Sequence, residues 1–394
     1  MNSNIAPTGS DWIDGIDNNF VMVLNDADLH ALCAQWKNCQ YLAMDTEFIR
    51  TTTFFPQVGL VQVNAGKGNY LIDPLAIADW GDFCELMVDP AITKVFHSCS
   101  EDLQVFMAVM QLVPSPVFDT QIAASLLNLG FGCSYQNLVR HYLEIDLPKG
   151  ETRSDWLQRP LHDRQLHYAA LDVACLPSIY LAQQTSLSEA GRLTWLEEEC
   201  RTLIDQYQRE LEGDFSGMFL GLKGAWQLNQ RQLVVLKKLA EWRELRARKR
   251  DKPRNWIIKE KQLIDIARLC PADIGELRRI DDLGKNFIRH EGNEVIDLVQ
   301  QALTIDEEML PDPIPDPLDG GAKNRLKRAQ QFARNRAEEL ELPTEMLIRK
   351  RWLITLMQNL RDSASASEDD LLPGELKGWR YDQLRPGLVE AIKK

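Results

Sequence analysis

The apolar run at residues 41–44 leads directly into two acidic residues, Asp45 and Glu47. Residues two apart in a β-strand project from the same face, so both carboxylates are expected to point the same way. Burying an unpaired carboxylate is costly, and a bound cation compensates that cost. A strand with this ending therefore constrains the fold to one that brings a cation, or further polar groups, to the same face.

Three more side chains supply oxygen atoms for such a site. Asp102 lies at the start of a helix predicted over residues 100–111. Tyr168 and Asp172 are four residues apart in a helix predicted over residues 166–180, so they lie one turn apart on one face. Magnesium and similar hard cations prefer oxygen ligands and commonly use a few carboxylates together with a substrate phosphate. The set predicts metal-assisted cleavage of a phosphodiester.

Two of these residues also have an ordinary structural explanation. The helix dipole favours an acid in the first turn, and Glu101 fits that explanation as well as Asp102 does. Tyr168 could be a core tyrosine whose hydroxyl bonds to a neighbour. Only its spacing from Asp172 favours a role in the site.

The first half of the chain alternates β-like runs with helical segments, which indicates an α/β layer fold with a mixed sheet flanked by helices. The predicted strands are residues 20–24, 41–47, 59–64, 69–72 and 93–97. Besides the two helices named above, the predicted helices are residues 29–36, 80–88 and 120–129.

The second half is predicted to form two small all-α helical bundles. Residues 208–217 contain two glycines, and residues 311–317 have a proline at every second position, which neither a helix nor a central strand accommodates. After the first break, one apolar stripe is predicted from Leu233, Leu236, Leu239, Trp242 and Leu245. The predicted division is a first domain at residues 1–205, a linker at 206–226, a helical unit at 227–305, a proline-rich linker at 306–322 and a helical unit at 323–394.

The two helical units look like weak copies of each other. Residues 252–258 and 342–348 each follow a basic helix and carry proline at the second position. Residues 276–280 and 375–379 form a second matching pair. The simplest alternative is that both bundles have only an architectural role.

Charge and composition limit the classes of partner that the protein can be expected to have. A net charge of −13 argues against a nucleic-acid partner, because binding a polyanion is helped by Lys and Arg. This charge is an average over the chain, however, and Lys and Arg are dense at residues 243–254 and 323–336. Such runs are more often solvated helix faces, but beside a phosphodiesterase site they favour RNA. No apolar run would span a bilayer, the opening residues lack a signal-peptide pattern, and the eight cysteines form no Cys-x-x-Cys motif. We therefore expect a cytoplasmic protein with reduced thiols and no membrane partner.

The order Asp-x-Glu, then an Asp that opens a helix, then Tyr-x-x-x-Asp is similar to that of the 3'-to-5' exonucleases with four acidic residues and a tyrosine. Residues 147–161 and 118–121 further resemble the ribonuclease D family. Both helical units resemble the helicase-and-RNase-D C-terminal (HRDC) module, the second more faintly. The resemblance implies a ribonuclease-H-like fold for the first domain and two divalent metal ions per site, Mg²⁺ or Mn²⁺.

By the same resemblance, Asp45 bridges both metal ions, Glu47 and Asp172 complete the first, and Asp102 holds the second directly or through water. The implied substrate is RNA with a free 3'-hydroxyl, including transfer-RNA precursors, and the implied products are nucleoside 5'-monophosphates. A free phenol has a pKa of about 10, which makes it a poor base at neutral pH. Tyr168 is therefore expected to orient the attacking water.

Three candidate substrate contacts lie near the first two acidic motifs. Phe54 and Phe55 could stack a terminal base, although burial in the core is an equal alternative. His97 could touch the substrate, but a structural histidine is the commoner outcome. For His162 and His167, too, a structural role is the commoner outcome.

Three further candidates are cationic residues in the segment before Tyr168: Lys149, Arg153 and Arg159. They could pair with phosphates or remain solvated at the surface. Two other functions stay open. The same five residues could serve a DNA-directed exonuclease, and a catalytically inactive nucleic-acid-binding scaffold is also conceivable, although it would have no need of four converging acids.

Overall fold

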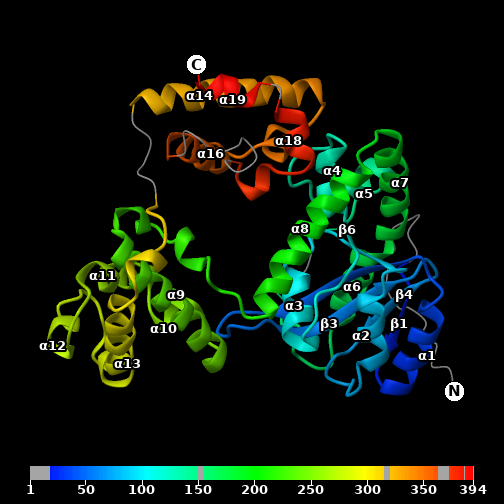
Figure 1. Ribbon diagram of the computed structural model, residues 1–394. Coiled ribbons are helices and arrows are strands. Elements are labelled where there is room, and N and C mark those ends of the chain that lie inside the picture. Colours follow the sequence, from blue (N-terminus) through cyan, green and yellow to red (C-terminus); the bar gives the residue numbers. More distant parts are fainter. Residues whose placement is uncertain (1–17, 149–153, 315–319, 363–371, 386, 394) are drawn as a thin grey trace.

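The computed structural model describes residues 18–148, 154–314, 320–362, 372–385 and 387–393. An α/β domain, coloured blue to green in Figure 1, is followed by a first helical unit in green and yellow and a second in orange and red. In the described residues, no helix is long and apolar enough to cross a membrane. The predicted fold class is confirmed: a mixed sheet with helices precedes helical C-terminal regions.

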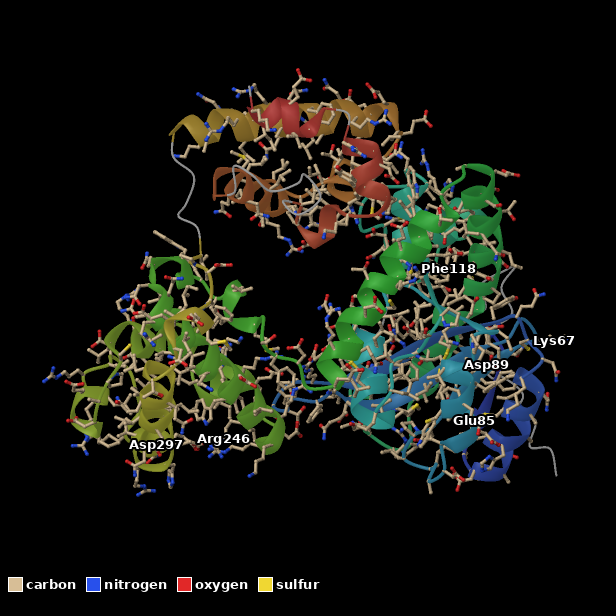
Figure 2. The ribbon with its side chains drawn as sticks, in the orientation of Figure 1. Lys67, Glu85, Asp89, Phe118, Arg246 and Asp297 are labelled. Atoms are coloured by element: carbon tan, nitrogen blue, oxygen red, sulfur yellow. The ribbon has the colours of Figure 1, made fainter. Side chains whose placement is uncertain are left out.

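The sheet of the α/β domain has six strands in the order β1-β4-β3-β2-β5-β6. The strands are β1 (Phe20–Val23), β2 (Tyr41–Ile49), β3 (Gln57–Asn64), β4 (Asn69–Ile72), β5 (Thr93–Phe96) and β6 (Val117–Asp119). Strand β3 is antiparallel to both of its neighbours, and the other pairs are parallel. The sequence predicted the first five strands and missed β6, whose three residues are too few to show a period. Phe118 of β6 is buried inside this domain, whereas the Lys67 side chain is on the outside (Figure 2).

The register of β2 leaves part of this strand unpaired with β5, at the place where the site lies. Its first residues pair with β5 only at Tyr41, Leu42 and Ala43, so the rest of β2 extends beyond the end of β5. On its other side β2 stays paired with β3, with a register shift between Glu47 and Phe48. The extended half of β2 is therefore open on one side for a helix that follows β5.

Helices cover both faces of the sheet (Figure 1). They are α1 (Asp26–Trp36), α2 (Gly81–Val88), α3 (Ser100–Met110), α4 (Thr120–Leu126), α5 (Tyr135–Leu143), α6 (Asp163–Ala174), α7 (Leu176–Glu189) and α8 (Leu193–Leu211). Met44, Val61 and Val63 belong to the core shared with α1 and α2, whereas Leu60 and Leu71 pack with Ala169 of α6 on the other face.

The helix predicted over residues 166–180 is two helices in the structure. Helix α6 ends at Ala174, and α7 begins at Leu176 with Pro177 in its first turn. Proline lacks the backbone N–H that a continuous helix would need there, and it is well tolerated in a first turn. The apolar spacing continued across the break, so the period alone did not reveal it.

Helix α8 runs through residue 206, where the sequence placed the start of a linker, and ends at Leu211. Tyr207 explains the continuation, because its ring is buried and its hydroxyl donates to the Ser100 carbonyl over 2.9 Å. Two short 3₁₀ turns, η1 (Met218–Gly221) and η2 (Ala225–Gln227), then lead to the first helical unit.

The first helical unit contains α9 (Gln230–Arg250), α10 (Arg254–Ile257), α11 (Glu260–Leu269), α12 (Ile274–Leu277), α13 (Lys285–Leu303) and the turn η3 (Glu307–Met309). Four residues of the predicted stripe on α9 are buried, but Leu245 is 53% exposed. A spacing of three residues falls about 60° short of a full turn, so the stripe drifts around the helix and leaves the buried face.

The second helical unit contains α14 (Gly320–Glu339), α15 (Thr344–Leu347), α16 (Lys350–Asp362), η4 (Gly374–Leu376), α18 (Trp379–Leu384) and α19 (Leu388–Lys393). Helix α14 therefore begins inside the segment that the sequence assigned to the proline-rich linker. The corner after the first helix has the same backbone in both units: Asp251 and Glu341 have φ of 48° and 49°, and Ile258 and Ile348 are both extended. This shared corner supports the interpretation of the units as copies.

Helix α8 carries the contact with the second unit. Trp195 stacks on Trp379 with ring centroids 4.5 Å apart, and Glu199 accepts two hydrogen bonds from the Arg380 guanidinium. Glu199 also accepts from the Trp379 indole N–H over 2.8 Å. The stacked rings and the paired charges together fix this unit to the α/β domain.

Candidate active site

Strand β2 and helix α6 build the first part of the site. Asp45 lies opposite Gln62 and Glu47 opposite Leu60 in the antiparallel ladder with β3, so all four side chains share one face of the sheet. Helix α6 packs on this face. It presents Tyr168 and Asp172 to the two carboxylates of β2.

Three carboxylates converge there as predicted. One oxygen atom each of Asp45, Glu47 and Asp172 can be chosen so that all three lie within 4.8 Å of one another. The Tyr168 hydroxyl interacts with the Asp172 carboxylate, and this contact alone would lower the pKa of Asp172 and raise that of Tyr168. Hard oxygen ligands at this spacing fit a divalent cation.

Asp102 reaches the site from the other side of β2. It lies in the first turn of α3, is 6% exposed, and accepts a hydrogen bond of 2.6 Å from the hydroxyl of Thr46. Glu101, the alternative in the sequence, is exposed. The structure therefore places Asp102 rather than Glu101 beside the acidic cluster, although Asp102 is not one of the three residues within 4.8 Å.

Asp119 holds the turn from which α3 starts. Its carboxylate accepts hydrogen bonds from the backbone N–H groups of Ser98 and Cys99 over 3.1 and 2.9 Å, and from Gln121 at the start of α4 over 2.8 Å. Ser98 has a positive φ of 62°. Asp119 thus joins the beginnings of α3 and α4 at the ends of β5 and β6, which positions Asp102.

The close packing of acids controls their protonation. Burial, followed by the charge of Asp172, raises the pKa of Asp45 well above its usual range. Burial and the neighbouring carboxylates raise the pKa of Glu47 to about 10, and burial raises that of Asp172 to about 8. Without a cation these groups therefore tend to hold protons. A bound divalent cation would reverse that balance and favour the ionised forms.

Tyr168 stays protonated by a wide margin. Burial, and after it the charges of Asp172 and Glu47, raise the pKa of its phenol above the ordinary value. A phenol in this state donates a hydrogen bond and does not accept a proton from water. The structure therefore presents Tyr168 as a hydrogen-bond donor.

A cavity of about 200 Å³ opens beside Tyr168 and Asp172. Its wall includes Ser134, Tyr135 and Gln136 from the start of α5. The Tyr135 hydroxyl donates to the Leu171 carbonyl over 2.9 Å, which ties α5 to the helix that carries the site. The sequence pattern did not single out these wall residues, because no carboxylate or helix period distinguishes them.

Phe54 lies in the core between the α/β domain and the first helical unit. It is 5% exposed and packs with the buried residues of that unit, and Phe55 packs beside it with ring centroids 4.9 Å apart. The backbone N–H groups of both residues donate to the Asp251 carboxylate over 2.9 and 3.0 Å. Of the two expectations for Phe54, core burial describes this structure, since no free ring face remains for a base.

The Arg159 side chain is likewise held by hydrogen bonds inside the α/β domain. Its guanidinium donates two hydrogen bonds of 2.6 Å to the Asp73 carboxylate and three more to the carbonyls of Gly59, Trp156 and Gln158. Because these donors are occupied, the arrangement does not leave the Arg159 guanidinium available to pair with a phosphate. Lys149 and Arg153 lie outside the described residues.

The histidine candidates are part of the scaffold. His97 is half-buried, its Nδ1 lies 2.9 Å from the Thr120 hydroxyl, and burial lowers its pKa. His162 caps the start of α6, and the His167 ring packs edge-on against Phe20. None of the three belongs to the acidic cluster.

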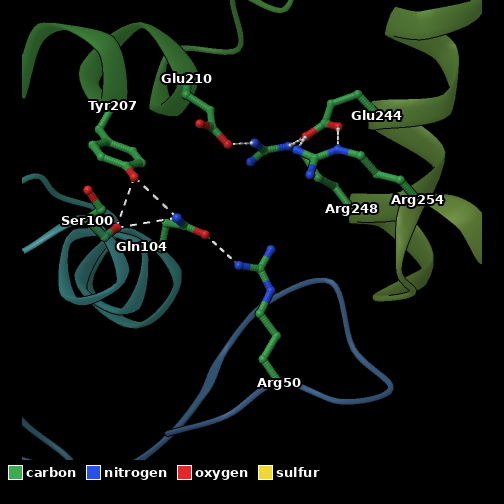
Figure 3. A network of polar contacts seen from close by, with 8 residues as sticks. All are labelled: Arg50, Ser100, Gln104, Tyr207, Glu210, Glu244, Arg248 and Arg254. Carbon is green, nitrogen blue, oxygen red and sulfur yellow. Dashed lines mark hydrogen bonds and ion pairs between the residues drawn. The ribbon is translucent and has the colours of Figure 1, made fainter. Parts of the chain in front are cut away.

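Arg50, Gln104 and Tyr207 on the α/β domain, and Glu244, Arg248 and Arg254 in the basic run of the first helical unit, form polar contacts (Figure 3). Arg50, directly after β2, donates to the Gln104 side chain over 2.5 Å, and Gln104 donates to the Tyr207 hydroxyl over 3.2 Å. On the first helical unit, Glu244 pairs with both Arg248 and Arg254. The contacts of Arg50 and Tyr207 with Gln104 could not be predicted, because these partners are 54 and 103 residues apart along the chain, whereas Glu244 and its two arginines lie within one basic run.

All three of these arginines face the ring of Phe54. The guanidinium carbons of Arg50, Arg248 and Arg254 lie 5.7, 5.0 and 4.9 Å from its centroid. Cations over an aromatic face are attracted to it. The loop after β2 is thus bound directly to the first helical unit.

Comparisons with known proteins agree with this arrangement. Residues 20–187 match the family model described as "3'-5' exonuclease", and residues 232–299 match the HRDC domain. Ribonuclease D from Pseudomonas paraeruginosa is 40% identical over 371 residues, which are 94% of this chain and 97% of that protein. Ribonuclease D from Escherichia coli is 34% identical over 377 residues, or 95% and 99% of the two chains.

A solved structure gives the same result. The crystal structure of E. coli RNase D, described as "an exoribonuclease involved in structured RNA processing", superposes with a TM-score of 0.83 over 95% of this chain and 99% of that one. The converging acids, the matched domains and these full-length similarities lead to one conclusion: the chain belongs to the ribonuclease D family of 3'-to-5' exonucleases.

Proposed function

We propose that this protein is a metal-dependent 3'-to-5' exoribonuclease that releases nucleoside 5'-monophosphates. The observation that carries the proposal is the convergence of Asp45, Glu47 and Asp172 within 4.8 Å, beside a protonated Tyr168. Three half-buried acids at this spacing repel one another when ionised and stabilise the fold poorly on their own. Such an arrangement is expected where a cation is to be bound.

The proposed cofactors are two divalent cations, Mg²⁺ or Mn²⁺. Asp45, Glu47, Asp102 and Asp172 would hold them, with Asp102 kept in place by the Thr46 hydroxyl. When bound, such ions lower the pKa of water and stabilise the charge on the attacking and leaving oxygens of a phosphodiester. The acids of this chain set the places of the ions and therefore the line of attack.

Tyr168 would act on the water that attacks the phosphorus. Its hydroxyl is close enough to Asp172 to interact with that carboxylate, and its raised pKa keeps the proton on the phenol oxygen. It would hold the water in line with the scissile bond. The adjoining cavity, with Tyr135 in its wall, offers room for the terminal nucleotide.

The proposed substrate is RNA with a free 3'-hydroxyl, including transfer-RNA precursors with 3' extensions. The E. coli relative, described as acting in structured RNA processing, supports RNA over DNA. We also propose that the two helical units contribute to RNA binding, and that the protein acts in the cytoplasm, where its eight free cysteines would stay reduced.

The test uses RNA and DNA strands of equal sequence, labelled at the 5' end. With Mg²⁺, we expect stepwise shortening of the RNA from its 3' end, release of 5'-monophosphates, and no reaction in chelator. A transfer-RNA precursor with a 3' extension should be trimmed in the same way. Faster digestion of the DNA would support the alternative of a DNA exonuclease, and intact RNA at all metal concentrations would support an inactive scaffold.

A further inference from the structure

Gln62 is buried beside the acidic cluster and has no hydrogen-bonding partner in the described part of the chain. The side chain is 0% exposed, and neither its amide nitrogen nor its amide oxygen makes a hydrogen bond there. Buried amides are nearly always paired, because an unpaired one loses its bonds to water without replacement. An unpaired glutamine at this place therefore requires an explanation.

The register of the sheet points to the missing partner. Gln62 lies directly opposite Asp45, and residues opposite each other in an antiparallel ladder have Cβ atoms about 4.5 to 5.5 Å apart on the same face. On its other side Gln62 lies opposite Leu71, which offers no polar atom. Of its neighbours on the same face of β3, Leu60 offers none either, and Asn64 instead donates to Asn69 and accepts from the Gly66 N–H. The Asp45 carboxylate is thus the neighbour in the sheet that could accept from the amide.

We propose that Gln62 is a positioning residue for the metal site and that its amide N–H donates to the Asp45 carboxylate when Asp45 holds a cation. A carboxylate has about four acceptor positions, so it can bind a cation and accept a hydrogen bond together. A donor of this kind fixes the orientation of a ligand and favours its ionised form. The inference rests on the proposed function, because it requires Asp45 to be a metal ligand.

Gln183 provides a matched control in the same domain. It is also 0% exposed, but its amide nitrogen donates to the Thr120 carbonyl over 3.0 Å, and its amide oxygen has no partner among the described residues. Gln183 is thus a buried glutamine with a structural bond. Replacing it tests what the loss of a buried amide does to stability alone.

The experiment compares Gln62→Leu and Gln183→Leu with the unaltered protein by isothermal titration with Mg²⁺ and by thermal unfolding with and without Mg²⁺. For Gln62→Leu we expect Mg²⁺ affinity to fall about 10- to 100-fold, as for other partners of metal ligands. Its melting temperature without metal should not fall, since an unpaired amide is removed. For Gln183→Leu we expect the reverse: a lower melting temperature and unchanged Mg²⁺ affinity.

If Gln62→Leu does not fold, the same measurements are made on Gln62→Met, which has an unbranched side chain. Gln62→Asn keeps the amide but shortens its reach, and we expect an intermediate affinity. Mg²⁺ affinity equal to that of the unaltered protein in the folded Gln62 variants would overturn the inference. Failure of the unaltered protein to bind Mg²⁺ would instead contradict the proposed function.

Discussion

Asp251 joins the first helical unit to the loop that follows β2. Its carboxylate accepts hydrogen bonds from the backbone N–H groups of Phe54 and Phe55 over 2.9 and 3.0 Å. Asp251 also ends α9 with a φ of 48°, which glycine and asparagine tolerate. Asp251→Gly therefore removes the acceptor and keeps the backbone conformation, whereas Asp251→Asn keeps an acceptor.

The size of the effect follows from these two bonds. A hydrogen bond to a charged group contributes about 1.5 to 3 kcal/mol. Both bonds share one oxygen of Asp251, and water can reach a partly buried amide once the acceptor is gone, so we expect a combined loss of about 2 to 3 kcal/mol. Because about 1.4 kcal/mol is a factor of ten, the ratio of docked to undocked loop should fall about 30- to 150-fold.

Hydrogen exchange followed by mass spectrometry measures this ratio directly, because the two amides concerned are the donors. In Asp251→Gly, the peptide containing Phe54 and Phe55 should exchange faster by about the same 30- to 150-fold factor, which is the expected change in the docking ratio. Asp251→Asn should exchange only a few-fold faster than the unaltered protein. Equal protection of this peptide in Asp251→Gly would refute the view that Asp251 holds the loop.

Three further perturbations have expected outcomes. Arg159→Met should lower the free energy of unfolding by about 3 kcal/mol in denaturant titrations, because the Asp73 carboxylate, which is 9% exposed, loses its partner. Arg380→Ala should weaken the attachment of the second helical unit, because Glu199 would keep only the bond from the Trp379 indole; limited proteolysis would show this as faster cleavage between the units. The Mg²⁺ concentration for half-maximal RNA digestion should fall as the pH rises from about 6 to about 8, because the raised pKa values of Glu47 and Asp172 mean that protons compete with the metal.

Each of these outcomes has a clear opposite. Unfolding of Arg159→Met at the same denaturant concentration as the unaltered protein would show that the Arg159–Asp73 ion pair is dispensable. Unchanged cleavage in Arg380→Ala would leave the stacked tryptophans Trp195 and Trp379 as the main attachment. A Mg²⁺ requirement that rises with pH would contradict proton competition at the carboxylates.

Local pattern was sufficient for the residues whose role depends on spacing within one element. Asp45 and Glu47 share a strand face, and Tyr168 and Asp172 share a helix face, and each pairing could be predicted from spacings of two and four residues. The convergence of the strand with the helix followed from the residue types and the family resemblance, not from spacing. Strand β2 was also predicted, because the apolar run at residues 41–44 is continuous. The break at Pro177 was missed since helical apolar spacing continues on both sides of it.

Roles set by distant partners could not be predicted in this way. Phe54 has its acceptor 197 residues away in Asp251, and Arg159 has its carboxylate 86 residues away in Asp73. An aromatic or cationic residue near an active-site motif is compatible with both substrate binding and burial until those partners are known. The unpaired amide of Gln62 likewise becomes visible only when its burial and its neighbours are known.

The most direct test of the central claim is digestion of a 5'-labelled RNA by the unaltered protein, Asp45→Asn and Asp172→Asn, with Mg²⁺ titration of each folded protein. Asparagine keeps the size of the side chain but removes the charge that the cation requires. We predict that the unaltered protein shortens the RNA from its 3' end in Mg²⁺, while both variants remain folded, bind Mg²⁺ more weakly and release no nucleotide. Nucleotide release at the unaltered rate by either variant would contradict the assignment of these carboxylates as the catalytic metal site.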